Sequence, residues 1–226
     1  MPAPADAGAP ADASIGGLFV ELWHDLPRLA SVSNLFILGG GGTVALAVEE
    51  SDASILARVS NSEFGELFNH GSAPGDGWVQ VGGALGTYVI GRVTGNATTL
   101  SVGTDLVQAQ LLNAVLTTGV KYAAQRTRPD GGHHSFPSGH TSSSFAGAAV
   151  LSRHFGWRVS VPAYGVASWV AIARVEEHHH YVSDVVFGAA LGVVSGRTVT
   201  VGKGSSQFRV SPALLPGGGG IYFTRK

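Results

Sequence analysis

The sequence predicts an all-α protein, a compact helical bundle built by one domain. Three observations support this: apolar residues recur at spacings of three and four, small residues fill these apolar stretches, and no convincing alternating strand occurs before residue 205. A chain of 226 residues is long enough for one well-buried domain. We therefore expect a flexible linker at residues 1–14, a helical domain at residues 15–200 with its core at residues 105–200, and a tail at residues 201–226.

The first half of the helical domain is less regular than the second. Residues 15–30 have the periodicity of an amphipathic helix, although Pro27 disturbs its far end. Residues 35–48 predict a helix whose four glycines, residues 39–42, would pack closely against a neighbour. Residues 51–76 carry scattered charges and predict a surface connection, and residues 78–94 are again apolar with small residues.

The second half shows clearer helix signals. Residues 105–128 predict one helix that Pro129 ends, and Ser138 predicts the N-cap of a helix at residues 139–153. Residues 159–174 predict a helix with Pro162 in its first turn, and residues 184–195 predict the last core helix. Residues 207–214 and 221–225 predict a hairpin or an irregular extension.

Composition limits the functional classes. Hydrophobic residues make up 44% of the chain and charged residues 13%, and the mean hydropathy of +0.22 lies between soluble and multi-span membrane proteins. A net charge of −1 gives no electrostatic reason to expect a nucleic acid partner. Because the chain has no cysteine, disulfides and cysteine zinc sites are excluded.

Two features bear on localisation. Residues 1–14 are rich in Ala, Pro and Asp and lack the basic start and apolar centre of a signal peptide. Such a stretch commonly follows a leader that has been removed, so we expect an exported protein, periplasmic or membrane-associated, whose leader is absent from this sequence. No apolar run reaches the roughly 18 to 20 residues that cross a bilayer; the longest are residues 32–48 and 159–173. This favours a soluble or peripheral domain and leaves a membrane-embedded one open.

The first candidate functional segment is basic. Lys121 and Arg128 are seven residues apart, two helical turns, so we expect both to project from one helix face and to meet the same anion. Pro129 fixes where the chain turns away. The alternative is a solvated basic helix end, because Arg126 lies between them.

The second segment, residues 137–140, reads Pro-Ser-Gly-His. The free amides at a helix start can bind an anion directly, and Gly139 has no Cβ to obstruct its approach. The alternative is an ordinary capped helix start, in which Ser138 serves only as the N-cap and His140 is merely exposed.

The third segment holds Arg174, His180 and Asp184. At a spacing of four on a helix, the Asp184 carboxylate would lie beside the His180 imidazole, accept a proton from one ring nitrogen and leave the other free to attack. Arg174, six residues before His180, can reach the same anion. The alternative is an ion pair on a surface helix.

Lys121-x6-Arg128-Pro129, Pro137-Ser138-Gly139-His140 and Arg174-x5-His180-x3-Asp184, in this order, resemble the three-part signature of the phosphatidic acid phosphatase type 2 superfamily. That superfamily groups lipid phosphate phosphatases, bacterial non-specific acid phosphatases and vanadium haloperoxidases. Ala173 stands where the family usually has serine, which removes one hydrogen bond beside the arginine. The resemblance covers residues 105–200.

The resemblance implies a metal-independent phosphomonoester hydrolase without a cofactor, whose substrate is a small-molecule or lipid phosphate, including an isoprenoid diphosphate. It implies that His180 forms a phosphohistidine, that Asp184 orients it and that His140 protonates the leaving alcohol. Activity is then expected to be highest near or below neutral pH, and vanadate is expected to inhibit. The residues implied to hold the phosphate oxygens are Lys121, Arg128, Ser138, Gly139 and Arg174.

Two alternatives stay open. A vanadium haloperoxidase would keep vanadate on His180, although such chains are usually much longer. A non-enzymatic anion- or metal-binding module would use the basic pocket and the histidine-rich segments, but consecutive histidines cannot all face one ion. We interpret the extra histidines as rim residues: His133, His134, His178 and His179. Membrane-surface association, the natural substrate and the oligomeric state are left open.

Overall fold

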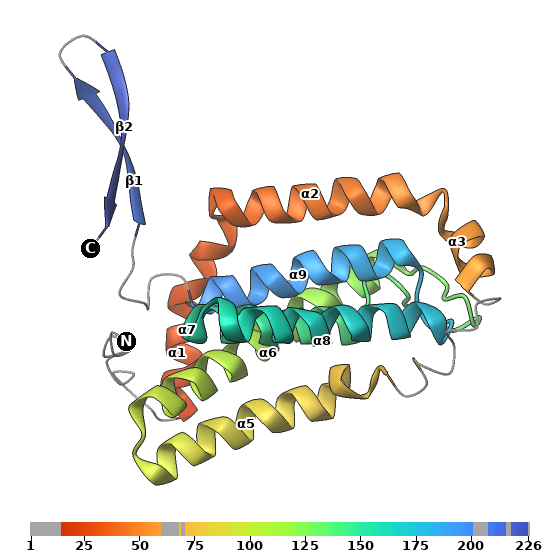
Figure 1. Ribbon diagram of the computed structural model, residues 1–226, viewed down its shortest axis with the longest axis horizontal. Coiled ribbons are helices and arrows are strands. Elements are labelled where there is room, and N and C mark those ends of the chain that lie inside the picture. Colours follow the sequence, from red (N-terminus) through yellow and green to blue (C-terminus); the bar gives the residue numbers. More distant parts are fainter. Residues whose placement is uncertain (1–14, 60–67, 69–70, 201–207, 216–217, 226) are drawn as a thin grey trace.

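The computed structural model describes residues 15–59, 68, 71–200, 208–215 and 218–225, and it confirms the all-α fold. Long helices run side by side along the bundle, with a small hairpin beyond one end (Figure 1). The elements in chain order are α1 (Ile15–Asp25), the 3-10 helix η1 (Leu26–Ala30), α2 (Val32–Glu49), α3 (Asp52–Val59), the 3-10 helix η2 (Ala73–Gly75), α5 (Gly77–Thr94), α6 (Ala97–Ala124), α7 (Gly139–Phe155), α8 (Trp157–Glu176), α9 (Val182–Thr200), β1 (Phe208–Leu215) and β2 (Gly218–Arg225).

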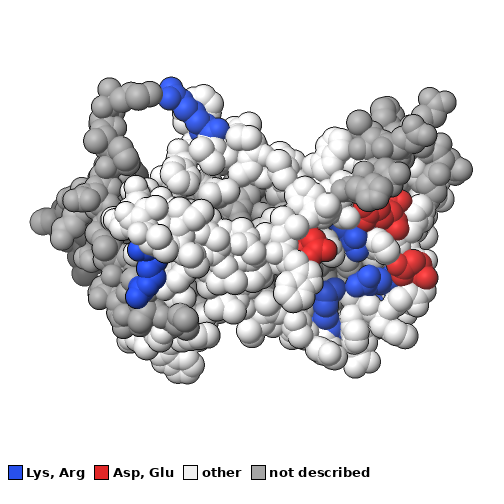
Figure 2. All heavy atoms as spheres, turned by 90° about the horizontal axis from the view of Figure 1, so that it is seen from below, with Lys and Arg blue, Asp and Glu red and all other residues white. Residues whose placement is uncertain are grey.

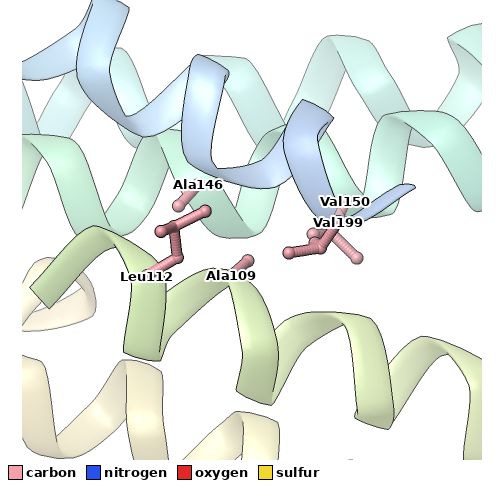
Figure 3. Packing of buried hydrophobic residues seen from close by; sticks show 5 residues of the cluster. All are labelled: Ala109, Leu112, Ala146, Val150 and Val199. Carbon is pink, nitrogen blue, oxygen red and sulfur yellow. The ribbon is translucent and has the colours of Figure 1, made fainter. Parts of the chain in front are cut away.

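Helices α7 and α9 form the centre of the bundle. Helix α7 packs on α6, α8 and α9, whereas α2 covers α9 and α5 covers α6. Three helices supply the central apolar cluster (Figure 3), whose members are Ala109, Leu112, Ala146, Val150 and Val199. Two of these five residues are alanines, so the helix backbones approach one another closely.

Side chains with short polar groups begin several of the helices. Ser31 accepts a hydrogen bond from the amide of Asn34 at the start of α2, and Asp76 accepts one from Trp78 at the start of α5. Asn96 caps α6 in the same manner. As predicted, Ser138 is the N-cap of α7. These caps satisfy amides that the first turn of a helix leaves without partners.

The N-terminal half departs from prediction at one connection and at Pro27. Pro27 lies at the start of η1, so the expected helix at residues 15–30 divides after Asp25. Helix α2 continues through its four glycines, as predicted, and a Cβ at Gly41 would overlap Ala190 of α9. The prediction of a surface connection throughout residues 51–76 is wrong, because α3 and η2 form within it.

The helix that carries the first basic segment also differs from prediction. Helix α6 begins at Ala97 and ends at Ala124, where Gln125 adopts the left-handed conformation with φ 47°. Arg128 therefore lies beyond the helix, and the argument that it shares a helix face with Lys121 is wrong. Pro162 lies inside α8, not in its first turn, because α8 already begins at Trp157.

Two helices of the described residues are long and apolar enough to cross a membrane, judged by length and composition only. They are α2 and α9, and the apolar window of α9 is 61% buried inside the bundle. The core helix of a soluble protein also meets this criterion when it is mostly buried. The sequence did not indicate α9 as long and apolar enough to cross a membrane, because α9 is not an uninterrupted apolar run.

The described part of the C-terminal tail is a hairpin. Strands β1 and β2 pair antiparallel, from Phe208 opposite Arg225 to Leu215 opposite Gly218. Of the two forms expected for the tail, a hairpin or an irregular extension, the structure shows the hairpin. The expected linker, residues 1–14, lies outside the described residues, as do residues 201–207.

Candidate active site

The three predicted segments meet at one end of the bundle. The end of α6, the start of α7, the end of α8 and the start of α9 all lie there, beside α3 (Figure 1). On the face shown in Figure 2, acidic side chains lie at this same end together with basic ones, the middle of the face carries neither, and further basic side chains lie towards the other end. The acidic side chains of this face thus lie where the helix ends leave polar backbone groups.

His180 and Asp184 form the predicted dyad. The Nδ1 atom of His180 lies 3.4 Å from Oδ2 of Asp184, and both side chains are buried. The same Oδ2 accepts hydrogen bonds from the Ser135 hydroxyl at 2.5 Å and from the Tyr181 amide at 2.9 Å. His180 precedes α9, so the two residues are not on one helix as predicted. With Nδ1 toward the carboxylate, Nε2 is the ring nitrogen that remains for attack.

Three cationic side chains lie close enough to one another to interact electrostatically: Lys121, Arg128 and Arg174. His140 is near two of them, Arg174 and Arg128. The Nε atoms of Arg128 and Arg174 are buried, and neither has a hydrogen-bond partner among the described residues. Buried guanidinium nitrogens are normally satisfied, so this arrangement fits a site for an anion.

Lys121 and Arg174 also make fixed contacts within the protein. The Nζ atom of Lys121 donates to the carbonyl oxygen of His134 at 2.6 Å, which ties the end of α6 to the loop before α7. The Nη1 atom of Arg174 donates to Glu177 at 2.8 Å. These contacts hold both cations in place before any ligand binds.

Ser138 and Gly139 are present at the site, but the serine hydroxyl is already engaged. Ser138 Oγ accepts hydrogen bonds from the amide and the hydroxyl of Thr141, at 3.4 and 2.9 Å, and the residue is fully buried. The Ser138 amide donates to the carbonyl oxygen of Asp184 at 3.0 Å, which ties α7 to α9. A Cβ at Gly139 would lie 3.8 Å from Cε of Lys121. The capping role of Ser138 is established, and phosphate binding by this pair stays a prediction.

Two of the four histidines interpreted as rim residues, His179 and His134, contact neighbouring side chains, and the rim interpretation stays a prediction. His179 Nδ1 lies 2.7 Å from Oδ2 of Asp130, on the exposed side of the site. The rings of His134 and Tyr122 are 4.9 Å apart. Within residues 15–59, 68, 71–200 and the hairpin strands, no group of three or more His, Asp or Glu side chains is arranged to hold a metal ion.

Burial and nearby cations control the protonation of the titratable side chains in the site. Burial lowers the pKa of His180 to about 4, and Asp184 only partly opposes this. Burial and the charge of Arg174 lower the pKa of His140 to about 4. Burial and the charge of Arg128 lower the pKa of Lys121 to about 8. Both histidines are therefore neutral and Lys121 is charged near neutral pH.

These pKa values predict a bell-shaped pH profile of kcat/KM for hydrolysis. Protonation of His180 removes the nucleophile, so activity falls as the pH drops through about 4. Loss of the Lys121 charge weakens anion binding, so activity also falls as the pH rises through about 8. Lys121→Arg should remove the upper limb and leave the lower one, as measured by steady-state kinetics across the range. An upper limb unmoved in this variant would contradict the assignment.

Sequence reasoning missed four polar residues behind the dyad. Ser135 binds Asp184, as described above, and Arg126 Nη1 donates to the other oxygen of Asp184 at 2.9 Å. The sequence indicates Arg126 only as a sign of a solvated helix end. It does not single out Asp52 and Ser183, which both contact Arg126. The available signal was Arg126 itself, an extra cation within the first basic segment.

Part of this chain is similar to known proteins. Residues 130–204 match the model of the PAP2 superfamily. The lipid A 1-phosphatase of Porphyromonas gingivalis is 40% identical over 96 residues, which cover 41% of this chain and 21% of that protein. A probable diacylglycerol pyrophosphate phosphatase of Schizosaccharomyces pombe is 36% identical over 75 residues, 27% of each chain. The matched part is thus about a quarter of the length of these relatives.

Solved structures show the same fold. The crystal structure of Aquifex aeolicus LpxE superposes with a TM-score of 0.55 at 21% identity, covering 66% of this chain and 93% of that one. A transmembrane PAP2-type phosphatidylglycerolphosphate phosphatase from Bacillus subtilis superposes with a TM-score of 0.52 at 21% identity, covering 81% and 92%. The resemblance to the PAP2 superfamily is therefore confirmed over residues 130–204, and these solved structures share the all-α fold of the chain.

Proposed function

We propose that this protein is a metal-independent phosphomonoester hydrolase that acts through a phosphohistidine on His180. The observation that carries the proposal is the convergence of Lys121, Arg128 and Arg174, with two unpartnered buried guanidinium nitrogens, on the side of a His180–Asp184 dyad. Such a site neutralises a phosphate without a metal ion and presents a nucleophile to it. The named phosphatase relatives support the same reaction class.

In the proposed reaction, Nε2 of His180 attacks phosphorus and the phosphorus–oxygen ester bond breaks. His140 gives its proton to the leaving alcohol, and Asp184 stabilises the positive charge on His180. A water molecule then attacks the phosphohistidine while His140 takes its proton, and inorganic phosphate leaves. Because burial and the charge of Arg174 leave His140 neutral near pH 7, the negative charge of the bound phosphate must raise the pKa of His140 before it can act as the acid.

We propose a lipid phosphate as the substrate and a membrane as the place of action. Two of the similar proteins are named for lipid or diacylglycerol phosphates. The bundle also exposes large apolar side chains on several helices, among them Phe36 and Leu46 of α2, Trp78 and Val93 of α5, and Trp157 of α8. Exposed apolar surface on this scale is typical of a face that contacts lipid. Export from the cytoplasm is part of the same proposal.

Hydrolysis in the presence of EDTA tests the function. We expect turnover of a chromogenic phosphomonoester at pH 6 with excess EDTA, and faster turnover of a long-chain lipid phosphate in detergent micelles. The chromogenic ester and the lipid carry the same phosphate group and differ in the leaving group. The ratio of their turnover rates therefore reports on the preference for the leaving group. Activity that EDTA abolishes and a divalent cation restores would overturn the metal-free reaction. Bromide oxidation with vanadate and peroxide, without hydrolysis, would favour a haloperoxidase instead.

A further inference from the structure

A buried ion-pair network behind the dyad connects α3 to Asp184. Arg126 follows α6; its Nη1 donates to Oδ1 of Asp184 at 2.9 Å and its Nη2 donates to Oδ2 of Asp52 at 2.9 Å. Asp52 is the first residue of α3 and is 3% exposed, and Asp184 is fully buried. One guanidinium group therefore joins two buried carboxylates that are far apart in the sequence.

Ser183 and Tyr181 fix the guanidinium plane of Arg126. Arg126 Nη1 also donates to Ser183 Oγ at 2.6 Å, and the Ser183 amide donates to Oδ1 of Asp52 at 3.1 Å. The Ser183 hydroxyl donates to Asp52 as well. The guanidinium carbon lies 4.4 Å from the centre of the Tyr181 ring. A planar group with several donors fits this arrangement, and a lysine ammonium cannot reproduce it.

The two oxygens of Asp184 have different partners. Oδ2 faces His180, Ser135 and the Tyr181 amide, whereas Oδ1 accepts from Arg126. A carboxylate held on both oxygens cannot rotate, so the contact with Arg126 keeps Oδ2 in line with Nδ1 of His180. Burial acts to lower the pKa of Arg126, but its bonds to Asp52 and Asp184 raise that pKa above its ordinary value, and the network stays charged.

Arg126 is engaged by carboxylates. Its ion pairs are with Asp184, with Asp52 and, at 3.7 Å, with Glu49 at the end of α2. The cations that influence His140 are Arg174 and Arg128. The terminal nitrogens of Arg126 thus bind acidic side chains of the protein, and its route to the reacting groups is through Asp184.

We propose that Arg126, anchored by Asp52, is a positioning residue: it fixes the orientation of Asp184 and, through it, aims His180 at the phosphorus atom. The proposal rests on the proposed function of the site, because it assumes that His180 is the nucleophile. It also gives α3, a short helix in a segment predicted to be a connection, a role at the active site.

The alternative is that the network only stabilises the fold, since removing one partner of a buried ion pair is strongly destabilising. The two roles differ in what they change. A structural role lowers the folded fraction and affects every ligand equally, whereas a positioning role acts on steps that need an aligned His180. Three charged groups act directly on His180: Lys121 of α6, Arg174 of α8 and Asp184 of α9. Two more lie behind Asp184: Arg126, which follows α6, and Asp52 of α3.

The test compares wild type with Arg126→Met, Arg126→Lys and Asp52→Asn. Arg28→Met is the matched control, because Arg28 of η1 pairs with buried Asp25, the last residue of α1, at the opposite end of the bundle. For Arg126→Met we expect kcat to fall about 10- to 100-fold, as when an outer partner of a catalytic group is lost, with KM changed less than about threefold. Arg126→Lys should recover only part of the loss, and Arg28→Met should keep the wild-type kcat.

Ligand affinity and pH dependence separate the two roles further. Vanadate requires an aligned His180, so its inhibition constant should rise about tenfold in Arg126→Met, whereas that of inorganic phosphate stays within about threefold. The acid limb of kcat/KM should move to higher pH in Arg126→Met, because the unpaired Asp184 charge then stabilises the imidazolium. In Asp52→Asn it should move to lower pH, because Arg126 loses a counter-charge.

Three results would overturn the proposal. They are an unchanged kcat per folded molecule in Arg126→Met, equal losses of vanadate and phosphate affinity, and acid limbs that do not move. If the wild type hydrolyses no phosphomonoester, the proposed function fails by itself. Calorimetric binding of vanadate and of phosphate to the same variants then decides the positioning role without turnover.

Discussion

His180→Ala is expected to lose about 10⁴-fold or more in kcat for phosphomonoester hydrolysis. His180 is buried beside Asp184, and Nε2 is its one ring nitrogen directed away from the carboxylate. Among the described side chains of the site, His180 is the one that both pairs with an aspartate and lies close to Lys121 and Arg174. The loss should be accompanied by the absence of a labelled phosphoenzyme after acid quenching of a reaction with radioactive substrate.

His140→Ala and His24→Ala give this experiment its comparisons. His140→Ala retains the nucleophile, so with a good leaving group it should still form phosphoenzyme and accumulate it, because water is no longer deprotonated. His24 is exposed on α1 away from the site, and His24→Ala should keep wild-type activity. Labelled enzyme in His180→Ala at the wild-type level would show that another residue is the nucleophile.

Gly192→Ala is expected to lower the free energy of unfolding by about 3 kcal/mol, at the upper end of overpacking effects. A Cβ at Gly192 of α9 would overlap the Ser142 carbonyl oxygen and lie 2.9 Å from the Ala146 amide nitrogen. Both atoms belong to the backbone of α7 and cannot rotate away. Urea denaturation followed by circular dichroism measures the change.

Gly119→Ala is the matched control, since no atom lies within 4 Å of a Cβ built there on α6. It should stabilise the protein by roughly 0.5 to 1 kcal/mol, because alanine restricts the unfolded chain and favours a helix. Gly192→Ala should also reduce kcat in its folded fraction, since α7 carries His140 and α9 carries Asp184. Equal stability of both variants would show that α7 and α9 can separate without cost.

Local signals in the sequence predicted most of the helices and brought out the candidate site residues. Apolar periodicity, N-cap residues and small residues predicted most of the helices, because these depend on neighbours within a few residues. Helix α3 was missed, since its eight residues are held in part by Asp52 and its distant partner Arg126. The boundary of α6 was missed because a left-handed Gln125 leaves no strong local signal.

The sequence by itself determined the fold class and the candidate set of site residues, because their order and spacing are local properties of the chain. The candidate set is Lys121, Arg128, Ser138, Gly139, His140, Arg174, His180 and Asp184. Only the tertiary structure decided how these residues meet. Arg128 approaches Lys121 from beyond the helix, and His180 contacts Asp184 from outside α9. The pairing of Arg126 with both Asp52 and Asp184 joins residues 74 and 58 positions apart. Contacts over such separations depend on the packing of whole helices, which no short segment specifies.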